Sequence, residues 1–312
     1  MSFVDVRPML DADLERADHV MRLAFGTFRG LPDPSATFGD REMVRTRFAA
    51  APEWAWVADV DGDVAGSVFA TRWGSFGFLG PLTVHPDVWD RGIGTRLLRP
   101  VLDVFEDWGV RQAGLYTFAA SPKHLGLYQR HGFRPGHLVV ILTKEVDAQM
   151  RRPHSGASRG ESDDRSLAEI RTLTDEVYMG LDLGHEIVAA NTQRIGETLL
   201  VHRDGTLEAV AVCQFGAGSE GGSDTCYVKF AAARPGDGVG DRFTRLLDAC
   251  EAFAAEAGLG RLEVGIDTGR LSAYGHLLDR GYKIGQVGVS MLLCPEQPHF
   301  DTASHHVIAD LR

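Results

Sequence analysis

The chain repeats one order of predicted secondary structure, and this duplication constrains its fold more than any other feature of the sequence. Each half contains a two-strand hairpin, a strand, a glycine loop, a helix, a strand, a helix and a last strand. The glycine pairs in the two loops, Gly92/Gly94 and Gly238/Gly240, lie 146 residues apart. A duplicated domain explains this regularity better than chance does.

A polar stretch marks the boundary between the two copies. Residues 149–166, QMRRPHSGASRGESDDRS, contain no large aliphatic side chain beyond Met150. This composition is typical of a mobile tether, with a long ordered loop as the alternative. We therefore predict a first domain over residues 1–147, a linker over 148–166 and a second domain over 167–312.

Apolar periodicity and turn residues locate the elements within each copy. The first copy is predicted to contain a strand at 3–10, a helix that Asp11 could cap, a helix within 40–50, a hairpin over 54–73, a strand at 76–84, helices at 95–107 and 122–131, and strands at 113–120 and 136–145. The second copy is predicted to contain a hairpin over 198–215, strands at 226–233, 261–267 and 282–293, and helices at 241–257 and 271–281.

Two segments of the second copy have weaker signals. The glycine- and serine-rich loop 216–224 is interpreted either as a mobile lid over the interdomain cleft or as an ordinary hairpin tip. The C-terminal tail holds His299, His305 and His306. We expect this tail to be solvated and not to bind metal, because no cysteine or acid recurs at ligand spacing.

Charge and composition limit the classes of partner. The formal net charge is −11, which argues against nucleic-acid binding because a polyanion would be repelled. An acidic surface could favour a cationic amine substrate, or it could serve solubility alone. No stretch is apolar over the length that spans a bilayer, and MSFVDVRPML lacks the features of a secretory signal.

The cysteines also indicate a compartment. Cys213, Cys226, Cys250 and Cys294 are widely spread, form no CxxC pair and lie mostly within apolar runs. We interpret them as buried free thiols. A cytoplasmic protein without a membrane partner is therefore predicted.

The strongest local motif lies between residues 82 and 98, LTVHPDVWDRGIGTRLL. A strand enters a turn, and Arg91-Gly92-Ile93-Gly94-Thr95 then opens a helix. Glycines allow main-chain N–H groups to approach an anion closely, and the helix N-terminus adds a partial positive charge. The motif predicts a pyrophosphate cradle, although a tight strand-to-helix turn would have the same sequence.

A second motif, LYQRHGF, follows and contains Tyr128, 34 residues after Gly94. Together the two motifs resemble the GNAT superfamily of N-acetyltransferases. Val84, Pro86, Gly92 and Gly94 match the family's V-x-P-x-x-(Q/R)-x-x-G-x-(G/A) stretch, and Tyr128, Gly132 and Phe133 match its later Tyr and Gly-Phe. Residues 1–147 have the family's element order, and the duplication suggests the tandem arrangement of several bacterial members.

The resemblance implies an α/β fold of two GNAT-like domains (α+β, three layers), each with a mixed, mostly antiparallel central sheet flanked by helices. It implies acetyl-CoA as co-substrate and no metal. Tyr128 would be the general acid that protonates the departing thiol, with an ordinary core tyrosine as the alternative. The residues expected to bind the cofactor are Leu82, Thr83, Val84, Arg91, Gly92, Ile93, Gly94, Thr95 and Ser121.

Two positions depart from the family pattern. Trp89 stands where Gln or Arg is usual, which removes one side-chain contact to phosphate, and Arg91 could compensate. Ser121 replaces the common Asn; its hydroxyl could bond the pantetheine arm, but we expect it mainly to cap the helix that begins at Pro122.

The general base is not evident from the sequence, because the strand FGFLGPLTV before the cradle contains no acid. A main-chain N–H of residues 79–84 would polarise the thioester carbonyl. His85 has a suitable unperturbed pKa but is expected to be structural. His124 and His131 are expected at the surface, and Asp33, Asp40 or Glu42 could act through water.

The second copy is predicted to be degenerate. Asp237 and Asp241 lie beside its cradle, where a phosphate would be repelled. Its catalytic position is ambiguous, since counting from the cradle gives Tyr274 and counting back from Gly281-Tyr282 gives Leu277. We expect this copy to be a scaffold, a substrate wall or a dimer surface.

The sequence thus predicts a cytoplasmic N-acyltransferase that moves an acetyl group from acetyl-CoA to a primary amine of a small molecule or peptide. A homodimer is left open. The alternative is an acyl-CoA-binding sensor or scaffold without turnover, which the missing carboxylate and Trp89 favour. Other nucleotide-binding folds fit poorly, because no Walker lysine follows the cradle and position 97 is Leu.

Overall fold

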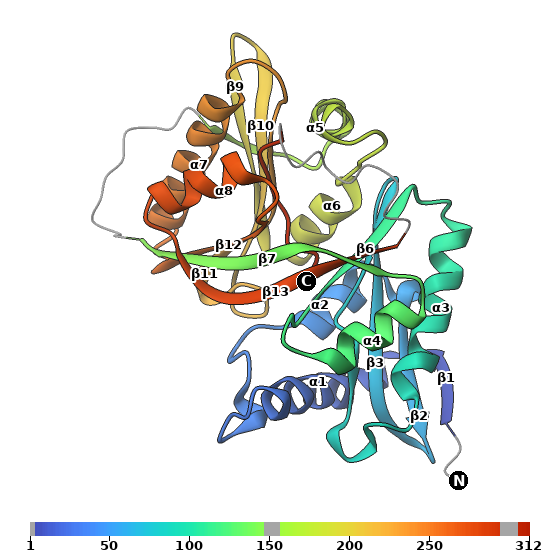
Figure 1. Ribbon diagram of the computed structural model, residues 1–312. Coiled ribbons are helices and arrows are strands. Elements are labelled where there is room, and N and C mark those ends of the chain that lie inside the picture. Colours follow the sequence, from blue (N-terminus) through green and yellow to red (C-terminus); the bar gives the residue numbers. More distant parts are fainter. Residues whose placement is uncertain (1–3, 147–156, 294–304) are drawn as a thin grey trace.

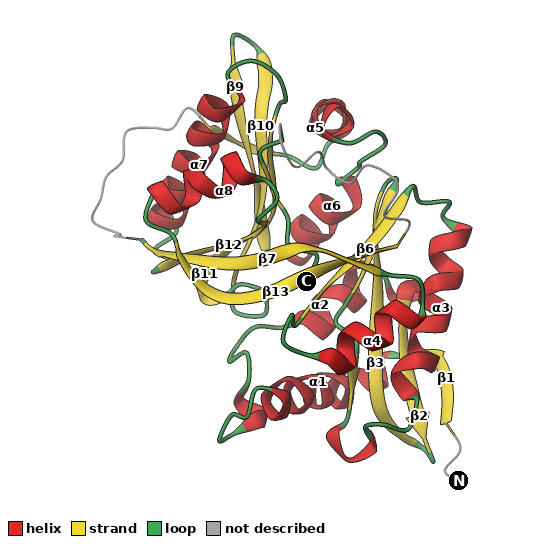
Figure 2. Cartoon of the chain, viewed as in Figure 1, coloured by secondary structure: helices red, strands yellow, loops and turns green. Residues whose placement is uncertain are grey.

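The computed structural model describes residues 4–146, 157–293 and 305–312. Figure 1 shows two halves of similar build, each a sheet with helices on both faces, joined across the middle by two long strands. Figure 2 shows the same arrangement by element type. The mixed, mostly antiparallel sheet flanked by helices confirms the predicted fold class.

The first half follows the predicted order closely. Its elements are β1 (Val4–Pro8), α1 (Leu14–Phe28), α2 (Met43–Ala50), β2 (Ala55–Val60), β3 (Asp63–Trp73), β4 (Phe76–Leu79), β5 (Thr83–Val84), α3 (Ile93–Asp107), β6 (Gln112–Thr117), α4 (Pro122–Arg130) and β7 (Arg134–Glu145). Alternate residues of β3 face opposite layers: Val68 packs with α3, whereas Phe69 packs with α1 and α2.

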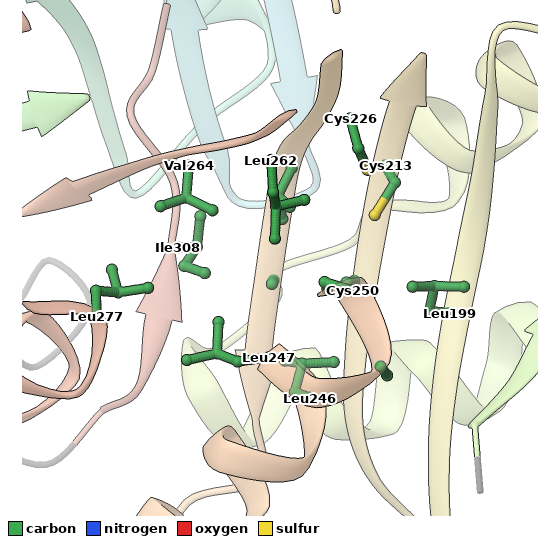
Figure 3. Close-up of a cluster of buried hydrophobic side chains, with 14 of the residues drawn as sticks. Leu199, Cys213, Cys226, Leu246, Leu247, Cys250, Leu262, Val264, Leu277 and Ile308 are labelled. Atoms are coloured by element: carbon green, nitrogen blue, oxygen red, sulfur yellow. The ribbon is translucent and has the colours of Figure 1, made fainter. Parts of the chain in front are cut away.

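The second half repeats this order. Its elements are β8 (Ala157–Gly160), α5 (Asp164–Val177), α6 (Gly184–Gln193), β9 (Gly196–Arg203), β10 (Thr206–Gly216), β11 (Gly222–Ala233), α7 (Val239–Glu256), β12 (Arg261–Asp267), α8 (Leu271–Asp279), β13 (Lys283–Leu293) and β14 (Val307–Ile308). Cys213 of β10, Cys226 of β11 and Cys250 of α7 are free and buried together where this helix packs on the strands, as Figure 3 shows, which confirms the prediction for these three. Cys294 lies outside the described residues.

The two halves exchange their last long strands. β7 of the first half pairs antiparallel with β12 of the second, from Val139↔Asp267 to Glu145↔Arg261. β13 of the second half pairs antiparallel with β6 of the first and also with β7. A single sheet of order β1-β2-β3-β4-β6-β13-β7-β12-β11-β10-β9-β8 results. Each half is therefore continuous in sequence, but its sheet is completed by a strand of the other half: β13 pairs with β6, and β7 pairs with β12.

Several local expectations need correction. Residues 157–160 form β8 and α5 begins at Asp164, so the C-terminal part of the predicted linker is ordered. Asp13, not Asp11, closes the turn before α1, because its carboxylate accepts the Leu10 N–H at 2.8 Å. The predicted strand 76–84 is interrupted: β4 ends at Leu79, and β5 pairs with β3, as β4 does, but not with β6.

The loop 216–224 is the tip of the β10–β11 hairpin, which was one of its two interpretations, whereas the tail was misjudged. Ser219 and Glu220 are buried in a tight turn, which is incompatible with a mobile lid. His306 and the residues after it are largely buried between the halves, where Val307 and Ile308 pair with β11. Figure 1 places the C-terminal label at the junction of the two halves. His299 lies outside the described residues.

Candidate active site

A cavity of about 520 Å³ opens where β4 and β6 diverge. The two strands pair in parallel only from Phe76↔Gln112 to Phe78↔Gly114, after which β4 ends and β5 pairs with β3 alone. This divergence leaves one edge of β5 free of a strand on the cavity side. The cavity reaches from the N-terminus of α3 to residues of the second half.

Most of the predicted cofactor residues line this one cavity. Arg91 does not line it; its guanidinium is exposed and donates to the Asp87 carbonyl oxygen at 3.2 Å. The predicted residues that the structure brings together with Tyr128 are Leu82, Thr83, Val84, Gly92, Ile93, Gly94, Thr95 and Ser121.

The N-terminus of α3 suits an anion. Gly92, its N-cap, has φ 77°, a conformation that favours glycine, and no side chain caps the helix there. The N–H groups of the first turn therefore have no side-chain acceptor. A Cβ on Gly94 would lie 3.3 Å from the Leu127 side chain. Gly94 thus also permits the close approach of α3 and α4. An uncapped helix end beside an elongated cavity fits the pyrophosphate and pantetheine of acetyl-CoA.

Trp89 has a structural role that the sequence did not reveal. Its indole N–H donates to the Val84 carbonyl oxygen at 2.6 Å, which fixes the turn before the cradle. Lys123 Nζ lies 5.2 Å from the indole ring centroid and 2.7 Å from Asp90 Oδ1. Lys123 and Arg130 of α4 line the cavity. These two cations supply charge that Arg91 was expected to provide.

Tyr128 is buried on the cavity side of α4. Its hydroxyl has no hydrogen-bond partner among the residues that the structure describes, and burial raises the pKa of the phenol well above its usual value. The phenol is therefore protonated at neutral pH, and its O–H can donate a hydrogen bond into the cavity. Ser121 caps α4 by accepting the His124 N–H at 3.3 Å, in agreement with its expected capping role.

Among the candidate bases, only His124 lines the cavity. Its ring packs against Phe28 at 4.9 Å and Phe118 at 6.2 Å, so the expected surface position is wrong. Burial, and then Lys123, lower the pKa of His124 below its ordinary value. The residues that do not line the cavity are His85, His131, Asp33, Asp40 and Glu42.

The second half forms one end of the cavity. From the sequence, a substrate wall was one of three possible roles for this copy. The second half contributes Glu220, Tyr227, Gln286, Leu311 and Arg312. No sequence motif marks these residues. Gln286 comes from β13, Leu311 and Arg312 come from the tail, and Glu220 and Tyr227 come from the β10–β11 turn and β11.

Glu220 is the centre of a buried ion-pair cluster at this end. It accepts from Arg47 Nε at 2.8 Å and from Lys229 Nζ at 2.7 Å. Burial opposes its ionisation, but these two cations prevail and lower the pKa of Glu220 to about 2. Arg47 also donates to the main-chain oxygens of Gly80 and Arg312. Glu220 is therefore an anchor of the wall and not a free base.

A second cluster lies beside the first. Arg41 donates both terminal nitrogens to Glu263, each at 3.0 Å, and Arg312 donates to the same carboxylate at 3.0 Å. Asp310 holds Arg312 Nε at 2.9 Å and accepts the Tyr227 hydroxyl at 3.1 Å. The tail is thus bound to both halves through charged side chains.

The corresponding cleft of the second half is filled by the chain itself. β11 pairs in parallel with β12 up to Val228↔Val264, and further along the same strand Ala231 and Ala232 pair with β14. Figure 3 shows Ile308 of this strand close to Leu277 and Val264. Leu277 is the seventh residue of α8, as Tyr128 is of α4, so no hydroxyl stands at the equivalent position.

Comparisons with known proteins agree with this geometry. Residues 21–133 match the model of the acetyltransferase (GNAT) family. The fold is similar to a putative acetyltransferase from Pyrococcus horikoshii, with 16% identity, a TM-score of 0.69 and coverage of 98% of this chain and 94% of that one. A tandem GNAT protein from the clavulanic acid biosynthesis pathway gives 12% identity, a TM-score of 0.59 and coverage of 93% and 98%. No curated protein sequence gives a significant match.

Residues 21–133 therefore form a domain of the GNAT acetyltransferase family, and the chain as a whole has the fold of solved GNAT proteins. Members of this family transfer acyl groups from acyl-CoA, with acetyl-CoA as the co-substrate. No helix within the described residues is long and apolar enough to cross a membrane. The same residues contain no cluster of His, Cys, Asp and Glu that could hold a metal ion.

Proposed function

We propose that the protein is an N-acetyltransferase that moves the acetyl group of acetyl-CoA to a primary amine of a small molecule or peptide. The observation that carries this proposal is the position of Tyr128. Its phenol lies on the wall of the same cavity as the uncapped N-terminus of α3. A proton donor and an anion cradle in one cavity fit a reaction that releases a thiol from CoA.

Different parts of the cavity would bind different parts of acetyl-CoA. The N–H groups of the first turn of α3 would hold the pyrophosphate, with Lys123 and Arg130 adding charge. The free edge of β5 would pair with the amides of the pantetheine arm. Within residues 79–84, the Gly80 N–H is bonded to Phe69 O and Pro81 has none. After these two positions, the Leu82 N–H is the next main-chain donor that could polarise the thioester carbonyl.

Acetyl transfer then needs two proton movements. The neutral amine attacks the thioester carbonyl, a C–N bond forms and the C–S bond breaks. Tyr128 donates its phenolic proton to the departing sulfur. Glu220 and Asp90 are ion-paired, whereas His124 is neutral and lines the cavity. We therefore propose that His124 accepts the proton that the amine loses, directly or through water.

Two measurements test the proposal against the alternative of a sensor without turnover. Calorimetric titration with acetyl-CoA should give one site per chain. Thiol release should then be stimulated by a panel of amines, because a sensor would bind acetyl-CoA and never liberate CoA. Absence of binding at millimolar acetyl-CoA would remove the assignment altogether.

A further inference from the structure

The charge of the cavity is opposite to that of the chain. The chain carries a formal net charge of −11. Among the described residues that line the cavity, the carboxylate side chains are Asp90 and Glu220, whereas the cationic ones are Arg29, Arg41, Arg47, Lys123, Arg130 and Arg312. A cavity built for a simple cationic amine would have the reverse composition. The expectation that an acidic chain favours a cationic substrate therefore does not extend to this cavity.

Acetyl-CoA accounts for only part of this positive charge. Lys123 and Arg130 belong to α4, next to the cradle. Arg41, Arg47 and Arg312 lie at the other end, where each contacts the second half or the tail.

Arg29 differs from the other arginines at that end. Arg41, Arg47 and Arg312 are engaged by Glu263, Glu220 and Asp310. Arg29 follows the last residue of α1 and lines the cavity, yet its guanidinium has no ion-pair or hydrogen-bond partner within residues 4–146, 157–293 and 305–312. An unpaired guanidinium beside a cavity can bind an anionic group of a ligand.

Polar groups and aromatic rings complete this end of the cavity. Gln286 donates to the Tyr116 hydroxyl at 2.7 Å, and both side chains line the cavity. Burial raises the pKa of Tyr116, whereas the charges of Arg312 and Arg29 oppose that rise, so both cations act on this phenol. Phe25 packs against Phe38 at 5.3 Å and against Phe118 at 5.9 Å, which gives an apolar wall.

We propose that the acceptor is an amine that also bears a carboxylate and an apolar side group, that is, a hydrophobic amino acid or a compound of that form. Arg29 binds the carboxylate, and the rings of Phe25, Phe38 and Phe118 hold the apolar group. This inference rests on the proposed acetyl transfer, since it names the substrate class of the same cavity.

The test compares two ligands that differ only in the carboxylate, L-phenylalanine and phenethylamine, titrated into CoA-saturated protein. L-phenylalanine should bind at least about tenfold more tightly, as expected for one charge-assisted contact. Arg29→Gln should reduce this preference to about threefold or less, and Arg29→Lys should retain part of it. Arg16→Gln, on an exposed turn of α1 outside the cavity, is the matched control and should keep the full preference.

Other outcomes contradict the inference in separable ways. Equal binding of the two ligands, binding of neither, or a preference unchanged in Arg29→Gln would overturn it. An Arg29-dependent preference for succinyl-CoA over acetyl-CoA would place the carboxylate on the acyl group instead of the amine. Thiol release with amines that lack a carboxylate would overturn the acceptor class and leave acetyl transfer intact, whereas failure to bind acetyl-CoA would overturn both.

Discussion

The guanidinium of Arg47 in α2 forms a two-point ion pair with Glu220, with Nε at 2.8 Å from Oε1 and Nη2 at 3.0 Å from Oε2. The two residues are 173 positions apart in the sequence and belong to different halves of the molecule. Both side chains are almost fully buried. This contact joins the α2 wall of the cavity to the β10–β11 turn of the second half.

Glu220→Gln should destabilise the protein by about 3–5 kcal/mol, because Arg47 and Lys229 would remain buried without their counter-charge. Chemical denaturation measures the change. Glu42→Gln is the control: it removes an i,i+3 pair with the largely exposed Arg45 and should alter stability by about 0.5 kcal/mol or less. A similar small loss in both variants would show that the buried cluster contributes little.

Stability should fall in acid as Glu220 is protonated. Its folded-state pKa of about 2 lies below the ordinary value of 4.5. Its contribution is therefore complete above pH 4.5 and is lost progressively as the pH falls toward 2. Glu263 adds to the same trend. Burial opposes its ionisation, but Arg312 and Arg41 lower its pKa to about 2. The free energy of unfolding measured from pH 6 downward should show a shallower slope in Glu220→Gln than in the wild type.

Tyr128→Phe should lower kcat by roughly 10²-fold or more, because the departing thiolate loses its proton donor. The affinity for acetyl-CoA should change little, since the ring remains in place. Steady-state kinetics and calorimetry separate the two quantities. Tyr116→Phe is the comparison, and it should affect the KM of the amine more than kcat. An unchanged kcat in Tyr128→Phe would remove this residue from the mechanism.

His124→Asn should lower kcat/KM and abolish the acid limb of its pH profile. In the wild type that limb should lie below pH 6.5, because burial and Lys123 lower the pKa of His124 and only the neutral imidazole accepts a proton. His131→Asn, outside the cavity at the C-terminal end of α4, should leave the profile unaltered. Persistence of the limb in His124→Asn would assign it to another group.

Gly92→Ala and Gly238→Ala form a matched pair. Both glycines are N-caps with φ 77°, and an added Cβ would meet no atom within 4 Å in either case. Each substitution should cost about 1–2 kcal/mol of stability through the left-handed backbone. Only Gly92→Ala should weaken the binding of acetyl-CoA, by about tenfold or more, because only the cleft of the first half is open. Calorimetry that showed equal weakening would indicate a second cofactor site.

The glycine turn before α3 and the elements of the first half could be predicted because their signals are local. Gly92 opens α3, Ser121 caps α4 and Tyr128 shares the α4 face with the cavity, all within short segments whose pattern is visible in the sequence. The interruption of 76–84 was missed, since an apolar run does not reveal where a strand loses one of its two partners, here β6.

The second-half wall could not be predicted for a different reason. Arg47–Glu220 and Arg312–Glu263 are pairs between distant segments, and no local pattern specifies which carboxylate meets which arginine. The tail was judged by its polar histidines, whereas Val307, Ile308 and Leu311 decide its burial. His124 was placed at the surface because its aromatic neighbours, Phe28 and Phe118, come from other elements.

The exchange of β7 and β13 has a consequence for biosynthesis. Translation proceeds from the N-terminus, so β7 emerges from the ribosome before either of its partner strands exists. The edges of β6 and β7 stay unpaired until Arg261–Asp267 and Lys283–Leu293 have been made. Unpaired edges are sites of aggregation. A stalled or truncated nascent chain that ends before Lys283 should therefore depend on chaperones or be degraded, and expression of the first half alone should give insoluble protein.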